Sequence, residues 1–205
     1  MIRTDRLREL QPMITWRQAK NFSPFRQFKL AKQRRWQRQV ALRAVDIIKE
    51  HTPPEGFAFF IDCGFNTRYV FDTYYKHLGA RFQYHGFEIQ KNLYDAAVAE
   101  RKYLGAHVTF HHAAVSDKNG ECYYFEPDSW GVNYKGGSSI MQEKSSRKMR
   151  IVNDVVQTID FAKFIKNTFC SGDFIVVKMD IEGAEYAVLE AMSCSGVLDM
   201  VDLLF

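Results

Sequence analysis

The chain has 205 residues, of which 46% are apolar and 25% charged, with a formal net charge of +4. This composition is that of a globular protein with one sizeable core, so wholesale disorder is excluded. No apolar run has the length of a membrane span, the first residues lack a signal-peptide core, and the four cysteines form no Cys-x-x-Cys pair. We therefore expect a cytoplasmic protein with reduced thiols and no membrane span.

The positive charge is concentrated near the N-terminus. Residues 1–50 hold 13 Lys and Arg against 4 Asp and Glu, whereas residues 51–205 hold 15 against 20. Residues 1–29 are typical of short helices or an arm, and residues 30–50, which lack Pro and Gly, predict a helix. Its apolar stripe is expected to pack on the following domain and consists of Trp36, Val40, Ala44, Ile47 and Ile48. The basic residues form either a solvated helix face or a contact with phosphate, an anionic surface or an acidic domain.

Beyond this arm, strand and helix patterns alternate. Residues 57–61 form a continuous apolar run, which is typical of a strand buried on both faces. The further expected elements are helix 68–78, strand 82–88, helix 91–103, strand 107–111, helix 160–168, strand 174–180, helix 183–193 and strand 200–205. This alternation predicts an α/β fold with a mostly parallel twisted sheet and helices on both faces. Residues 115–158 interrupt it with a turn at Asn119-Gly120, an aromatic strand and a Gly/Ser/Lys-rich loop over 130–147.

Two acids stand where the first two strands are expected to end, at the edge where parallel sheets bind ligands. Asp62 is followed two residues later by Gly64, as in nucleoside-binding turns, although ordinary turns share this pattern. Glu88 ends the second strand, where a carboxylate can accept two hydrogen bonds from a ribose diol or complement the dipole of the next helix. After the third strand, the small Ala114 leaves room either for an adenine ring or for helix packing.

Charged residues surround the end of the fourth predicted strand. Lys178 and Asp180 lie in the strand, and Glu182 and Glu185 fall at the start of the next helix. Three carboxylates close to one ammonium group shift one another's pKa values, and such shifts produce general bases. The alternative is a set of acids that are favoured there by the helix dipole alone.

Two segments, Val156 to Asp160 and Val177 to Glu190, closely resemble the signature of the FkbM-type methyltransferases, a family of S-adenosylmethionine-dependent O-methyltransferases. The resemblance covers residues 57–205 and includes Gly137-Ser138-Ser139. It implies a Rossmann-like class I methyltransferase fold that binds S-adenosylmethionine. The implied cofactor-binding residues are Asp62, Gly64, Phe65, Asn66, Arg68, Glu88, Ala114 and Asp180.

The resemblance also sets the expected domains, a basic helical N-terminal arm over residues 1–50 and the methyltransferase domain over residues 51–205. One departure is Arg68, which stands where the family commonly has a second glycine; its side chain either turns outward or clamps the methionine carboxylate of the cofactor. The other is the end of the sequence on the expected fifth strand. Either the arm and the 127–147 loop complete the acceptor pocket, or the chain is cut from a longer polypeptide.

Methyl transfer to a hydroxyl requires an in-line arrangement of the reactants and a base for the hydroxyl proton. Asp180 is the first candidate for that base, followed by Glu182 and Glu185, and Lys178 could lower the cost of the alkoxide electrostatically. A divalent ion on Asp180 and Glu182 could serve the same purpose, but we expect a reaction without metal.

The resemblance also implies the acceptor, because relatives commonly methylate sugars of glycans, polysaccharides and glycosylated natural products. We expect a deoxysugar or hexose hydroxyl and, since relatives occur fused to glycosyltransferases, a glycosyltransferase as partner. An alternative is an RNA 2′-O-methyltransferase, in which the basic arm with Trp16, Phe25 and Trp36 contacts nucleic acid; we expect this less than the glycan. A third possibility, suggested by Arg68, is a binding module without catalysis.

Overall fold

The computed structural model describes residues 24–104, 107–127, 138–140 and 149–205. Its elements in chain order are α2 (Pro24–His51), β1 (Ala58–Cys63), α3 (Tyr69–Leu78), the 3-10 helix η1 (Gly79–Arg81), β2 (Phe82–Glu88), α4 (Lys91–Leu104), β3 (Val108–His112), β4 (Ala114–Ser116), β5 (Gly120–Pro127), β6 (Met149–Asp160), α5 (Phe161–Thr168), β7 (Phe174–Met179), α6 (Glu185–Cys194), the 3-10 helix η2 (Val197–Met200) and β8 (Leu203–Leu204).

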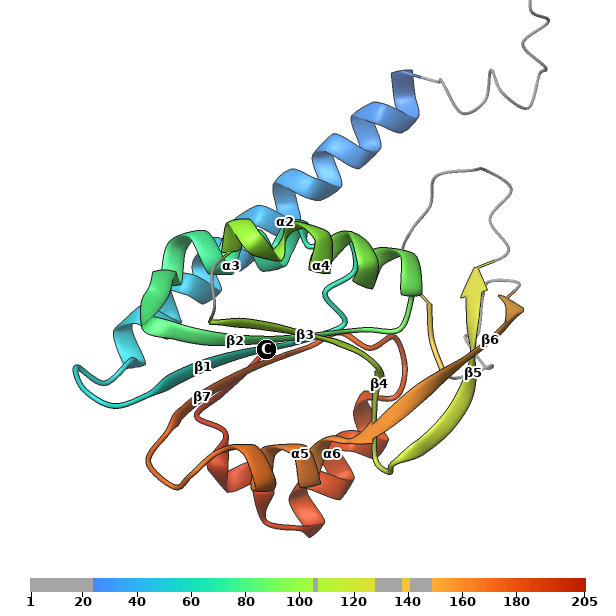
Figure 1. The fold of residues 1–205 in the computed structure, drawn as a ribbon. Coiled ribbons are helices and arrows are strands. Elements are labelled where there is room, and N and C mark those ends of the chain that lie inside the picture. Colours follow the sequence, from blue (N-terminus) through green and yellow to red (C-terminus); the bar gives the residue numbers. More distant parts are fainter. Residues whose placement is uncertain (1–23, 105–106, 128–137, 141–148) are drawn as a thin grey trace, which may run out of the picture.

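Five strands form one sheet in the order β3-β2-β1-β7-β8, and each neighbouring pair in it is parallel. Helices α2, α3 and α4 cover one face, and α5 and α6 cover the other (Figure 1). The central strand β1 is buried along its whole length, with Phe60 in one apolar layer and Ile61 in the other. The predicted α/β fold with a parallel sheet and helices on both faces is confirmed.

The elements of this sheet begin and end within a few residues of their expected bounds. Asp160, expected to be the first helical residue, is instead the N-cap of α5, because its carboxylate accepts a hydrogen bond from the backbone N–H of Lys163 at 3.0 Å. The strand expected over 200–205 is shortened to β8, because the turn of η2 runs through Met200.

A second sheet, with the order β4-β6-β5, lies beside the first. Strand β4 is parallel to β6, and β5 is antiparallel to it. The aromatic strand expected after Asn119-Gly120 is confirmed as β5, but treating residues 115–158 as otherwise irregular was wrong. Strand β6 escaped recognition because its pairing with β5 shifts between Tyr123 and Tyr124, where two extra residues of β6 interrupt the alternation.

The long helix α2 docks on the domain, as expected, but through a different face. Its buried residues are Ala41, Ala44, Val45 and Ile48, which recur at the i, i+3, i+4, i+7 spacing of one helix face. The predicted stripe was therefore partly wrong, since Trp36 is 63% exposed and Val40 and Ile47 are also exposed. Helix α2 carries two apolar stripes, and helical spacing alone does not tell which one meets the domain.

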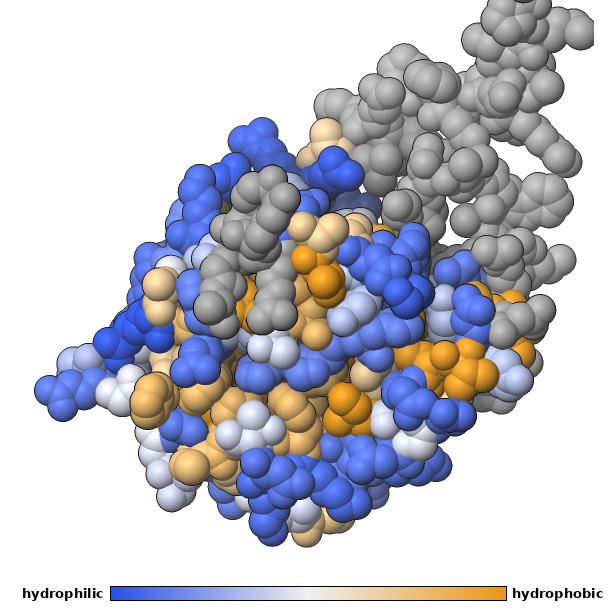
Figure 2. Space-filling model, viewed as in Figure 1, coloured by the Kyte–Doolittle hydropathy of each residue, from blue (hydrophilic) through white to orange (hydrophobic). Residues whose placement is uncertain are grey.

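The surface in Figure 2 is largely hydrophilic, with apolar residues in separate patches. Within the part of the chain that the structure describes, none of the helices combines the length and the apolar character that crossing a membrane requires. The loop expected over residues 130–147 lies outside the described residues, except for Ser138, Ser139 and Ile140, of which Ser139 pairs with Phe125 of β5.

Candidate active site

Three chain segments meet tightly where β1 ends. The backbone N–H groups of Gly64 and Phe65 both donate to the carbonyl oxygen of Phe87 on β2, at 3.0 and 3.1 Å. On the other side, the backbone N–H of Asp180 donates to the carbonyl oxygen of Cys63 at 3.0 Å. Gly64 has φ = 87°, and a Cβ atom there would lie 2.3 Å from the carbonyl oxygen of Asp180. Only glycine permits this approach, which is made by the chain itself; the expected approach of a ligand at Gly64 stays a prediction.

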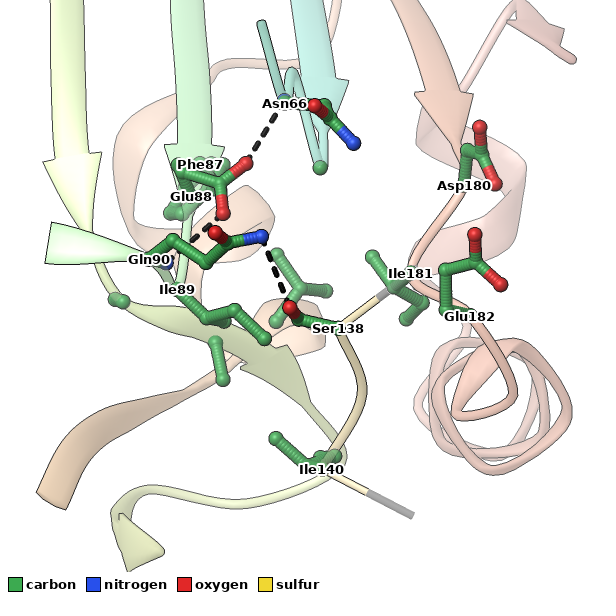
Figure 3. Close-up of a pocket in the computed structure, with 14 residues that line it drawn as sticks. Asn66, Phe87, Glu88, Ile89, Gln90, Ser138, Ile140, Asp180, Ile181 and Glu182 are labelled. Carbon is green, nitrogen blue, oxygen red and sulfur yellow. Dashed lines mark hydrogen bonds between the residues drawn. The ribbon is translucent and has the colours of Figure 1, made fainter. Parts of the chain in front are cut away.

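A pocket opens at this carboxyl edge of the sheet (Figure 3). The described residues that line it are Gly64, Asn66, Phe87, Glu88, Ile89, Gln90, Ala113, Ala114, Val115, Ser138, Ile140, Asp180, Ile181 and Glu182. Glu88 and Gln90 stand on one side of it, and Asp180 and Glu182 stand on the other. Small and aliphatic side chains form much of the wall between them, which suits a flat apolar ring with polar groups at its ends.

Glu88 is the most constrained acid of this pocket. It is 5% exposed, and its two oxygens accept hydrogen bonds from the backbone N–H groups of Asn66 and Gln90, each at 2.8 Å. Burial raises the pKa of Glu88 to about 6, although those N–H groups oppose the shift. The backbone N–H of Ile89 also interacts with this carboxylate. A carboxylate has about four acceptor positions, so Glu88 can still accept a hydrogen bond from a ligand.

Asp62 and Lys178 form an ion pair outside the set of residues that line the pocket. They are directly paired positions on β1 and β7, and Lys178 Nζ lies 2.8 Å from Asp62 Oδ1. Burial raises the pKa of Asp62 despite the attraction of Lys178; burial alone would lower the pKa of Lys178, but the carboxylates of Asp62 and Asp180 raise it. The second oxygen of Asp62 is buried and has no hydrogen-bond partner among the described residues.

The three acids after β7 differ in their surroundings. Asp180 is exposed on the rim of the pocket. Glu185 accepts hydrogen bonds from the backbone N–H groups of Ile181 and Gly183, at 3.0 and 2.7 Å, so its carboxylate holds the turn that precedes α6. Glu182 lines the pocket in a left-handed backbone conformation with φ = 62°. Asp180 and Glu182 are therefore placed to meet a substrate, whereas Glu185 supports the turn.

Three of the proposed cofactor residues do not line the pocket: Asp62, which pairs with Lys178, and Arg68 and Phe65. The guanidinium group of Arg68 donates to Asp72 at 3.4 Å and to Glu100 of α4, and its side chain is 10% exposed. Arg68 thus takes the alternative that directs it away from the pocket. Phe65 is buried and packs on Phe110, with ring centroids 5.0 Å apart. The proposed cofactor residues that line the pocket are Gly64, Asn66, Glu88, Ala114 and Asp180; their contact with a cofactor stays a prediction.

Sequence reasoning did not select the polar residues that connect the two sides of the pocket. Gln90 donates from Nε2 to Ser138 Oγ at 2.9 Å, and Ser139 donates from Oγ to the carbonyl oxygen of Glu182 at 2.7 Å. Ser139 is also paired with Phe125 through both backbone groups, at 2.8 and 3.0 Å. The sequence feature that pointed to this segment was the Gly137-Ser138-Ser139 motif of the family resemblance, to which no role was assigned. In the described ranges, no group of three or more His, Cys, Asp or Glu is arranged to hold a metal ion.

The strand order β3-β2-β1-β7-β8, with its pocket at the carboxyl edge and a buried acid ending β2, defines the Rossmann-like fold of class I methyltransferases. Residues 62–199 match the methyltransferase FkbM domain. This match spans more than half of the chain, so the protein belongs to the FkbM methyltransferase family and is a methyltransferase. No curated protein and no solved structure matches the chain.

Proposed function

We propose that the protein transfers a methyl group from S-adenosylmethionine to a sugar hydroxyl of a glycan or polysaccharide. One observation carries the proposal. Glu88 and Asp180, two carboxylates with different surroundings, face one pocket from the ends of β2 and β7. The buried acid is suited to hold a neutral diol, and the exposed acid is suited to accept a proton.

The residues of the pocket fit this cofactor. Glu88 retains acceptor capacity for the ribose hydroxyls, and Gly64 lines the same pocket. Ala114, Val115 and Ile140 give the pocket an apolar wall that suits the adenine ring. When bound, S-adenosylmethionine supplies a methyl group on a positively charged sulfur. The chain itself has to orient the acceptor hydroxyl and remove its proton.

Asp180 is our candidate for removing that proton. Its carboxylate is exposed on the rim of the pocket and is attracted by the buried ammonium group of Lys178. Lys178 is itself paired with Asp62, so it acts on the site as a fixed positive charge behind Asp180. Glu182 is the second candidate, since it also lines the pocket. Glu185 is a weaker candidate, because its oxygens already accept backbone hydrogen bonds.

The conformation of Arg68 weighs against a binding module without catalysis. Arg68 has φ = 61°, the left-handed conformation that glycine adopts readily, so the substitution leaves the turn after β1 with the backbone that a glycine would give it. The RNA 2′-O-methyltransferase remains the second candidate, because α2 carries exposed basic residues. Reaction without metal, a cytoplasmic location and a glycosyltransferase partner stay predictions.

Titration of the full chain with S-adenosylmethionine by calorimetry, followed by methyl-transfer assays, tests this proposal. The acceptor panel comprises deoxysugar glycans, hexose glycans and RNA, with labelled cofactor as the methyl donor. We expect cofactor binding and transfer to at least one glycan class. The absence of cofactor binding by the folded chain would favour the binding module, and transfer to RNA alone would favour the second candidate.

A further inference from the structure

Helix α2 carries an unusual distribution of charge. Residues 24–45 contain seven Lys and Arg and no Asp or Glu. In residues 31–40 every position is exposed except Gln37, which is half-buried. The four residues that α2 buries on the domain lie farther along, from Ala41 onward. About half of this helix, which is about 42 Å long at 1.5 Å per residue, is therefore a basic rod that leaves the body of the protein (Figure 1).

The exposed cations on this rod repel one another. Lys32 and Arg35 are three residues apart, and Arg34 and Arg38 are four apart, the spacings at which helical side chains are neighbours. With no acid among residues 24–45, no opposite charge within this stretch offsets the repulsion. Such a helix gains stability when an anionic partner lies along it.

The rod begins at the same edge of the sheet as the pocket. The guanidinium group of Arg34 lies over the ring of Tyr69, 5.9 Å from its centroid. Tyr69 is the first residue of α3 and directly follows the turn after β1. The other end of α2, at His51, precedes the start of β1. Helix α2 therefore runs from the carboxyl edge to the amino edge of the sheet, and its free half lies at the edge where the pocket opens.

We propose that the free half of α2 binds a polyanionic glycan, a sugar chain with carboxylate or other anionic groups along it, and holds it beside the pocket as the acceptor. This inference rests on the proposed function and specifies its substrate class. Arginine binds carboxylates and similar anions through two parallel hydrogen bonds, and Arg35 and Arg38 are exposed for this contact.

Two other polyanionic partners fit the rod less well. Proteins that bind single-stranded nucleic acid combine positive charge with several aromatic platforms. Among positions 31–40, where the structure describes the exposure of the side chains, Trp36 is the single aromatic residue; Phe25 and Phe28 precede this stretch. A helix that lies on a membrane needs an apolar face along its length. Between Leu30 and Ala41, Trp36 and Val40 are the only apolar residues larger than alanine, and the other positions from 32 to 39 hold charged or amide side chains.

The test compares two triple variants of the full chain. Lys32→Gln/Arg35→Gln/Arg38→Gln removes charge from the rod and leaves the Arg34 contact with Tyr69 intact. The matched control, Lys76→Gln/Lys118→Gln/Lys166→Gln, removes three exposed charges from other parts of the domain. Fluorescence anisotropy measures binding of polygalacturonate, dextran sulfate, neutral dextran and single-stranded RNA of similar length, without cofactor.

We expect the rod variant to bind polygalacturonate or dextran sulfate at least about tenfold more weakly than the native chain, and the control to bind within about twofold, at an ionic strength of about 0.05 M. Which of the two glycans binds identifies the anion. Equal weakening in both variants, equal binding of neutral dextran, or tighter binding of RNA than of either anionic glycan would overturn the proposal. Calorimetry with S-adenosylmethionine tests the methyltransferase function separately, because binding of glycan by the rod requires no cofactor.

Discussion

Lys178 on β7 and Asp62 on β1 pair across the middle of the sheet, with Nζ 2.8 Å from Oδ1, although they are 116 residues apart in the chain. The side chain of Asp62 is fully buried and that of Lys178 is 14% exposed. Removing one partner of such a pair leaves the other charge buried without compensation, which costs about 3 to 5 kcal/mol, whereas replacing both by apolar groups is often neutral.

Lys178→Met is therefore expected to lower the free energy of unfolding by about 3 to 5 kcal/mol, and Asp62→Leu/Lys178→Met is expected to recover most of that loss. Urea unfolding followed by circular dichroism measures both variants. If the double variant were less stable than the single one, the ion pair would make a net contribution to the free energy of unfolding and would not serve only to fix β1 against β7.

Glu88 predicts how cofactor affinity depends on pH. Its pKa is raised to about 6 in the free protein, and hydroxyl donors of a bound ribose stabilise the ionised carboxylate. Binding therefore favours loss of the proton, so affinity for S-adenosylmethionine should rise as pH increases through about 6 and level off above about 7.

The same shift affects stability with the opposite sense. Because the folded-state pKa of Glu88 lies above its value in the unfolded chain, its contribution to stability is present at low pH and is lost as pH rises through about 6. Glu88→Gln removes both effects. Calorimetric titrations with S-adenosylmethionine between about pH 5 and about pH 8 measure the effect on affinity. If Glu88→Gln kept the native pH dependence of affinity, another group would be responsible for that dependence.

Arg68 allows the two alternatives for its side chain to be separated. Arg68→Ala keeps the left-handed backbone and loses the contacts with Asp72 and Glu100, whereas Arg68→Gly loses the same contacts but relieves the backbone. We expect the alanine variant to be less stable than the glycine variant by about 1 to 2 kcal/mol in urea unfolding. Affinity for S-adenosylmethionine should stay within a few-fold in Arg68→Gly. A large loss of affinity would instead indicate that Arg68 binds the methionine carboxylate of the cofactor.

Asp180→Asn separates a base from a structural acid. The change keeps the size of the side chain and removes its charge, so a base would lose about two to four orders of magnitude in rate. Cofactor affinity should change little, because Glu88, the proposed acceptor for the ribose hydroxyls, stands on the opposite side of the pocket. Asp199→Asn, at an exposed acid on η2, is the matched control. Methyl transfer at a near-normal rate by Asp180→Asn would contradict the assignment of Asp180 as the base and make Glu182 the candidate.

Local sequence patterns predicted the central sheet and the edge at which the pocket opens. Apolar runs such as residues 57–61 and 174–177 are long enough and apolar enough to be buried strands, and polar residues that follow such strands fall at one edge. For that reason Gly64, Glu88 and Asp180 were found as pocket residues before the fold was known. Local patterns suffice to predict these strands and strand ends, because each is specified by a run of neighbouring residues.

Which of the candidate residues face the pocket depends on contacts between segments that are distant in the sequence. Glu185 and Asp180 are alike in sequence, but the first accepts backbone hydrogen bonds and the second remains exposed. Likewise, spacing gave α2 two apolar stripes, and the shape of the domain selected the one that begins at Ala41. Contacts such as Ser139 with Glu182 join segments far apart in the chain. No local periodicity encodes them, because they depend on where the completed strands deliver each side chain.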